Sequence, residues 1–292
     1  MGIQKYHLGC PIWAKKEWAG ELFSERVKAT DYLREYASVF NAVEGNSTFY
    51  SLPPEKVVLK WLADTPSHFR FCFKFPRRIS HDKKLQQAEK ETEIFLNRLR
   101  PLRARLGPLF LQLSSTFGPA AFALIENYLP ALPQDFQYAL EVRHPHFFDN
   151  GAQEKQLNDL LQELKIDRVI FDARALHASP IPDRFIQEAQ RRKPKAPVRF
   201  IATGNRPFVR LVVDPRLPEM PQHFSEWAKV FVQWLAEGKT PFMFVHTPDD
   251  FFAPRMARQF HELLAQKCPE VGALPRWPAE KKIADEKQLS IF

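Results

Sequence analysis

Three carboxylates and one histidine occupy comparable places in this sequence, each at or near the end of a short apolar run. They are Glu44, Glu141, Asp172 and His246. Carboxylate oxygens bind hard divalent cations, and imidazole is a common ligand of Mn and Zn. A divalent metal held by these four side chains, whether Mg, Mn or Zn, could activate water for attack on a phosphodiester. The residue types are therefore compatible with metal-assisted hydrolysis.

Cationic side chains at equivalent places are compatible with a second chemistry. Lys74, Arg143, Arg174 and Arg210 could clamp a phosphate group without a metal. A carboxylate or His246 would then act as the general base. The spacing does not decide between the two interpretations, so the predicted catalytic set draws on both. That set is Glu44, Lys74, Glu141, Asp172 and His246.

Several loops that follow the apolar runs mix polar, cationic and aromatic residues. Aromatic rings beside cations can stack a base or a sugar while the cations hold a phosphate. A single loop histidine can instead fix the loop through a hydrogen bond. The predicted substrate-binding residues are Asn46, Tyr50, Arg77, His81, Gln112, Arg143, His144, Arg174 and Arg210.

Eight short, β-rich apolar runs must position these side chains, and most of the gaps between them show helical periodicity. The runs are residues 6–9, 41–45, 70–75, 109–113, 138–142, 168–172, 208–213 and 242–246. Strands that alternate with helices over about 250 residues predict a (β/α)8 TIM-type barrel. A doubly wound parallel sheet is the alternative fold.

Alternation along each strand predicts which way the polar groups point, because residues two apart share a face. Glu141 and Arg143 would point into the barrel, and Asp172 and Arg174 would share a face with Ile170. Barrel enzymes carry their active sites at the C-terminal ends of the strands. Buried charges are costly unless they pair or line a wet pocket. We expect a functional pocket there; the alternative is an inert salt-bridge network that fills the barrel mouth.

Five motifs, in order along the chain, resemble the bacterial YecE-like family, a domain of unknown function (number 72). They are Val43–Tyr50, Phe71–Pro76, Ile79–His81, Glu141–Pro145 and His246–Asp249. The resemblance extends over nearly the whole chain and implies a TIM-type barrel. It implies no established reaction.

The composition is that of an ordinary globular protein with a basic charge. The chain has 292 residues, a formal net charge of +8 and only three cysteines, Cys10, Cys72 and Cys268. Three cysteines far apart argue against a disulfide framework and a zinc ribbon. There is no secretory signal and no apolar run of about 18 residues, so we expect a cytoplasmic protein without membrane association. Glycine-rich dinucleotide, Walker-type and Gly-x-Ser-x-Gly motifs are absent.

Two segments depart from the alternating pattern. Residues 178–208, between the sixth and seventh strands, hold Arg191, Arg192, Lys193 and Lys195, which predicts an inserted loop with a basic face. Such a run is either a solvated surface or a nucleic-acid contact. After Cys268 the periodicity stops. We therefore divide the chain into a barrel over residues 1–268 and a flexible tail over residues 269–292.

The last five residues resemble the peptide by which bacterial DNA polymerases and repair proteins bind the DNA sliding clamp. Gln288 could donate hydrogen bonds, while Leu289, Ile291 and Phe292 could enter an apolar pocket on the partner. Short motifs of this kind bind weakly because they become ordered only on binding. The alternative is an apolar cluster that folds back on the protein.

Three functions fit these features. The first is an enzyme, of hydrolase type, that acts on phosphodiester or phosphate-bearing nucleic-acid substrates and is recruited to DNA through the clamp. The second is a metabolic enzyme for a small anionic or sugar-phosphate substrate. The third is a non-catalytic adaptor that binds nucleic acid or protein. A basic charge favours anionic partners in all three cases.

Overall fold

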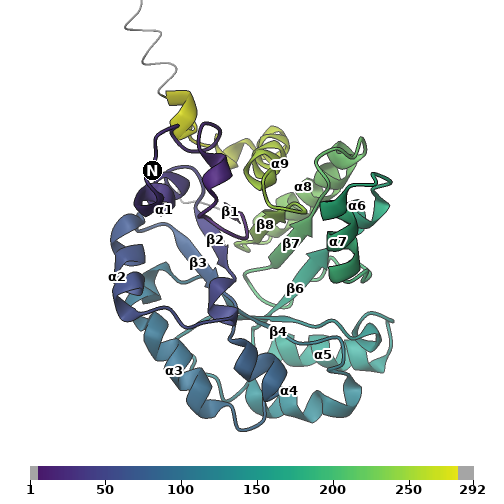
Figure 1. The fold of residues 1–292 in the computed structure, drawn as a ribbon. Coiled ribbons are helices and arrows are strands. Elements are labelled where there is room, and N and C mark those ends of the chain that lie inside the picture. Colours follow the sequence, from purple (N-terminus) through teal and green to yellow (C-terminus); the bar gives the residue numbers. More distant parts are fainter. Residues whose placement is uncertain (1–5, 282–292) are drawn as a thin grey trace, which may run out of the picture.

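The computed structural model describes residues 6–281, in which eight parallel strands alternate with helices (Figure 1). The strands are β1 (His7–Gly9), β2 (Ala42–Gly45), β3 (Arg70–Phe73), β4 (Leu109–Gln112), β5 (Tyr138–Glu141), β6 (Asp167–Asp172), β7 (Phe208–Val212) and β8 (Phe242–His246). Each coincides within two residues with a predicted apolar run. The positions of the strands were therefore predictable from the sequence.

The strands do not form a closed eight-stranded barrel, so that prediction is wrong. Six of them make one parallel sheet in the order β1-β8-β7-β6-β5-β4, and β2 and β3 make a separate two-stranded sheet. The larger sheet curves as a half-barrel. The alternative of a doubly wound sheet is not seen either, since the helices lie around the outside of the strands in Figure 1.

Side chains interrupt the hydrogen bonding between β1 and β2. The Tyr36 hydroxyl accepts the amide of Cys10 at 2.7 Å and donates to the carbonyl of Ala42 at 2.9 Å. The Asn41 side-chain oxygen accepts a hydrogen bond from the amide of Leu8 at 2.7 Å. These groups occupy positions that a backbone ladder would need. Between β3 and β4, isolated bridges at Phe71–Leu106 and Lys74–Phe110 take the place of a continuous ladder.

Amphipathic helices cover the outer faces of both sheets. They are α1 (Tyr32–Ala37), α2 (Glu55–Asp64), α3 (Glu89–Leu99), α4 (Phe122–Tyr128), α5 (Ala152–Glu163), α6 (Arg174–Ala178), α7 (Arg184–Arg192), α8 (Met220–Ala236) and α9 (Ala253–Lys267). Their buried faces and the outward strand residues form the main, aromatic-rich core. None of the helices found between residues 6 and 281 has the length and apolarity to cross a membrane.

Parts of the predicted insertion and of the predicted tail belong to the described residues. Helix α7 lies within the insertion, and the side chain of its N-cap residue, Asp183, accepts hydrogen bonds from the amides of Phe185 and Ile186. Residues 269–281 pack on α9, where the Arg258 guanidinium lies 3.7 Å from the centre of the buried Trp277 ring. The peptide at residues 288–292 lies outside the described residues.

Candidate functional site

Strand register builds the site in two layers. The lower, apolar layer of inward side chains is Ala42, Cys72, Phe110, Ala139, Val169, Phe208, Phe242 and Phe244. Residues two positions further along a strand must point the same way. The upper layer therefore contains Glu44, Lys74, Gln112, Glu141, Phe171, Arg210 and His246. Six of these seven were predicted site residues.

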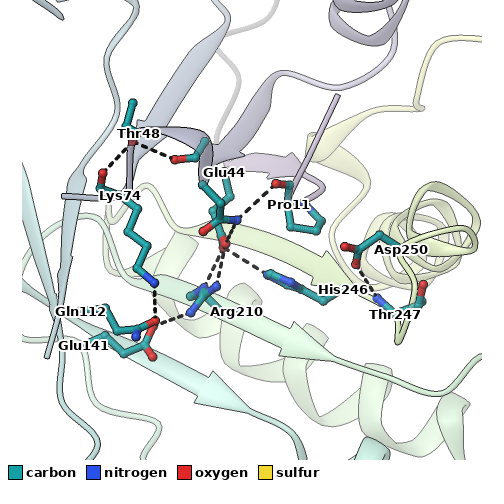
Figure 2. A network of polar contacts seen from close by, with 12 residues as sticks. Pro11, Glu44, Thr48, Lys74, Gln112, Glu141, Arg210, His246, Thr247 and Asp250 are labelled. Atoms are coloured by element: carbon teal, nitrogen blue, oxygen red, sulfur yellow. Dashed lines mark hydrogen bonds and ion pairs between the residues drawn. The ribbon is translucent and has the colours of Figure 1, made fainter. Parts of the chain in front are cut away.

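Arg210 is at the centre of the upper layer and bonds two carboxylates (Figure 2). Its Nε and Nη2 donate to the two oxygens of Glu44 at 2.8 and 2.7 Å, and its Nη1 donates to Glu141 at 2.6 Å. Glu44 also accepts from Asn46 at 2.7 Å and lies 3.1 Å from His246 Nε2. Each Glu44 oxygen thus has two donors, which fills its acceptor capacity.

A second group of polar contacts continues from Glu141 toward β3. Arg143 Nε donates to Glu141 at 2.7 Å, and Arg143 Nη2 donates to the Gln112 side-chain oxygen at 2.9 Å. The same oxygen accepts from Lys74 Nζ at 2.9 Å. The Lys74 ammonium also lies 3.9 Å from the centre of the Phe49 ring. Gln112 therefore fixes the spacing of two cations.

The electrostatics hold both glutamates in the ionised form. Burial alone opposes ionisation, but Arg210 and His246 outweigh it and hold the pKa of Glu44 well below its usual range. Burial likewise opposes ionisation of Glu141, and Arg143 and Arg210 lower its pKa to about 2. Carboxylates this well paired are poor proton acceptors near neutral pH. Their observed contacts are with Arg210, Arg143, His246 and Asn46.

Among the predicted catalytic residues, Lys74 has a pKa close to neutral pH. Burial, followed by repulsion from Arg210, lowers its pKa from the ordinary value of 10.5 to about 7. A lysine with such a pKa can donate or accept a proton at physiological pH. The buried imidazole of His246 also has a lowered pKa, chiefly because of desolvation.

Two residues at the site were missed from the sequence, Lys193 and Asp250. Lys193 follows α7, and its Nζ lies 5.9 Å from the centre of the Phe171 ring. Burial and the charge of Arg210 lower its pKa. Asp250 lies in the loop after β8, and burial raises its pKa. Both come from irregular segments, where no periodic pattern marks an inward residue.

Asp172 and Arg174 lie elsewhere, which corrects their predicted place in the pocket. Asp172 accepts from Trp227 Nε1 on α8 at 2.9 Å and from Arg174 at 2.8 Å. Arg174 also bonds Glu226 at 2.6 Å. The inward residue at this level of β6 is Phe171, so the predicted facing of that strand is reversed. These two residues join β6 to its covering helix.

The predicted metal ligands do not converge. Arg210 lies between Glu44 and Glu141, and Asp172 faces α8, so only Glu44 and His246 of the four are close together. Across residues 6–281, no group of three or more His, Cys, Asp or Glu side chains is arranged to hold a metal ion. This donor set does not fit Mg, Mn or Zn.

The remaining predicted residues lie around the rim. His81 packs its ring against Phe49 at 5.1 Å, and burial and the Lys74 charge lower its pKa. Tyr50 is 82% exposed beside Phe49. Arg77 is exposed and pairs with Asp82, while His144 stacks on His146. Of these four, His81 and Tyr50 are connected to Lys74 through Phe49.

Comparison with known proteins identifies the family. The family described as "Protein of unknown function DUF72" matches residues 7–282. The chain belongs to the DUF72 family. It is 39% identical over 277 residues to the UPF0759 protein YecE of Escherichia coli strain K12 and to that of Escherichia coli O157:H7, covering 95% of this chain and 99% of each relative.

Solved structures of DUF72 proteins share the fold. A crystal structure from Enterococcus faecalis has a TM-score of 0.69 at 20% identity and covers 89% of this chain and 95% of its own. One from Thermotoga maritima has a TM-score of 0.66 at 20% identity, with 89% and 98% covered. At this identity the likeness concerns the fold alone. The resemblance noted from the motifs is confirmed at the level of the family.

Proposed function

We propose that this DUF72 protein is an enzyme that binds a phosphate-bearing substrate beside the ion pairs of Arg210 with Glu44 and Glu141. Lys74 is its proton-transfer group. The supporting observation is the surplus of cations. Arg210 satisfies Glu44 and Glu141, and three further cations lie close by: Arg143 and Lys193 near the Phe171 ring, and Lys74 on the Gln112 oxygen that Arg143 also bonds. Within residues 6–281, the pair between Arg143 and Glu141 is the only ion pair that these three cations make. Such a group of cations matches a phosphate.

The recessed position of the cations favours a small phosphate ester over duplex DNA. Lys74 is buried, and the Arg143 side chain is only 21% exposed. A duplex backbone would meet the rim before it reached either group. The end of a single nucleic-acid strand could enter, and the exposed Arg191 and Arg192 of α7 would favour that source. The shared chemistry is a phosphate ester.

Replacing Arg143 with alanine is expected to weaken phosphate binding by roughly tenfold or more, the usual effect of one charge-assisted hydrogen bond. Calorimetric titration with inorganic phosphate, ribose 5-phosphate and a short 5′-phosphorylated oligonucleotide checks this. Arg100→Ala, at an exposed arginine that precedes β4 and pairs with Asp135, is the matched control. Tighter binding of the oligonucleotide than of the sugar phosphate would support a nucleic-acid substrate. Equal phosphate binding by wild type and Arg143→Ala would refute the site.

A non-catalytic adaptor remains the competing function. It would bind nucleic acid through the basic surface near α7, with an affinity that falls steeply with salt. Its affinity would be indifferent to Lys74 and Arg143. The titrations above therefore separate it from the enzyme.

We also propose that the terminal peptide recruits the protein to the bacterial sliding clamp. The support is the sequence of residues 288–292 alone. Substituting Leu289 and Phe292 together with alanine is expected to abolish capture by immobilised clamp, because the apolar anchors supply most of the affinity of such motifs. Lys287→Ala, just outside the motif, is the control. Undiminished capture of the double variant would end this proposal without affecting the phosphate site.

A further inference from the structure

The loop after β8 holds a carboxyl group that the site does not neutralise. Asp250 has φ +60°, a left-handed conformation that aspartate tolerates better than most residues. Its Oδ1 accepts the amide of Thr247 at 3.2 Å. Within the described part of the chain, Oδ2 accepts no hydrogen bond and Asp250 enters no ion pair. Figure 2 places Asp250 beside Thr247, beyond His246 as seen from Glu44.

A second open acceptor lies on the neighbouring His246. Glu44 is ionised and can only accept, so the His246 Nε2 atom 3.1 Å away must carry the proton of this bond. In the neutral imidazole, which burial favours, Nδ1 is then an acceptor. Among residues 6–281, Nδ1 of this buried histidine has no hydrogen-bond partner.

The surroundings of these two acceptors select the kind of donor that they could bind. The charged and titratable groups facing Asp250 are His246, Lys193, Glu44 and Cys10. Lys193 and the nearby Arg210 would repel an ammonium group on a ligand. Neutral hydroxyl groups meet no such repulsion, and each can donate its one proton to one of the two acceptors. The arrangement therefore suits a compound with hydroxyl groups.

We propose that Asp250 and His246 form a hydroxyl-binding subsite, so that the ligand is the phosphate ester of a polyhydroxy compound. This inference rests on the proposed phosphate site. The phosphate would lie toward Lys74, and the hydroxyl groups would lie near Asp250, on the other side of Arg210 (Figure 2). Arg143 shares the Gln112 oxygen with Lys74 and so lies at the phosphate end. Both ends of the ligand would then find partners that the protein leaves open.

The test compares a phosphate ester that is rich in hydroxyl groups with one that has none. Wild-type protein is titrated calorimetrically with ribose 5-phosphate and with butyl phosphate, and we expect the sugar phosphate to bind about tenfold more tightly, as hydrogen bonds to a charged group allow. Asp250→Gly should remove most of this preference and leave butyl phosphate binding unchanged. Glycine suits φ +60°, which protects the fold. Asp249→Asn, at the exposed neighbour, is the control.

The outcomes separate this inference from the proposed function. Equal affinity of wild type for the two esters would overturn the hydroxyl subsite and leave the phosphate site standing. A full preference retained in Asp250→Gly would remove Asp250 from the subsite. Failure of wild type to bind any of the phosphate compounds would overturn both proposals.

Discussion

Replacing Arg210 with methionine is expected to lower the free energy of unfolding by about 3–5 kcal/mol, the range for breaking a buried ion pair by removing one partner. The reason is that Glu44 and Glu141 are both fully buried and both depend on the Arg210 guanidinium. Without it, two carboxylates would be left in the interior with insufficient compensation. Urea unfolding monitored by tryptophan fluorescence measures the change.

Two further variants separate charge imbalance from lost packing. Arg77→Met removes an exposed, singly paired arginine and should change the unfolding free energy by about 1 kcal/mol or less. Combining Arg210→Met with Glu44→Gln and Glu141→Gln should recover much of the loss, because removing all members of a buried charge group costs less than removing one. If the triple variant were no more stable than Arg210→Met, the charge explanation would be wrong.

Replacing Lys74 with methionine is expected to abolish the pH dependence of anion binding near neutrality. The pKa of Lys74 is about 7, so its charge is lost as the pH rises through that value. Wild-type affinity for sulfate, which does not itself titrate here, should fall by roughly tenfold or more between about pH 6 and about pH 9. Lys74→Met should bind sulfate weakly at every pH. Lys155→Met, at an exposed paired lysine, should behave as wild type.

The titration of Lys74 should also make the free energy of unfolding depend on pH when no ligand is present. Folding lowers the pKa of Lys74, so the unfolded chain binds more protons between about 7 and 10.5. The unfolding free energy contributed by this residue therefore rises with pH across that window and is constant below it. Lys74→Met should lack this contribution. An unchanged pH profile of both binding and stability in the variant would show that Lys74 does not titrate as the structure indicates.

The sequence predicted the strands and most of the site because one rule governs both. Inward residues recur every second position, and six of the seven upper-layer residues follow from that alternation. The alternation also held at β6, but the face that carries Asp172 was predicted to point inward, and it points outward. Arg168 and Asp172 face outward, where Glu154 and Trp227 satisfy them. Periodicity alone does not distinguish a charge paired with a helix from one that lines a pocket.

The wrongly predicted closed barrel and the two missed site residues in loops have a different origin. The separation of β1 from β2 depends on where the Tyr36 hydroxyl and the Asn41 amide lie in space. Neither position follows from the local pattern. Lys193 and Asp250 reach the site from irregular segments whose course is set by tertiary packing. The roles assigned to the site residues remain predictions, as does the terminal peptide.

Because the strands form two sheets, the ion pairs at the centre of the site also connect one sheet to the other. Glu44 and the Lys74 region belong to the two-stranded sheet, whereas Arg210 and Gln112 belong to the six-stranded one. The ionic contacts thus cross-link two parts that share few backbone bonds. An anion bridging Lys74 and Arg143 would add another cross-link at the same junction. Binding of the anion would then stabilise the contact between the two sheets, and a more stable contact would raise the affinity for the anion.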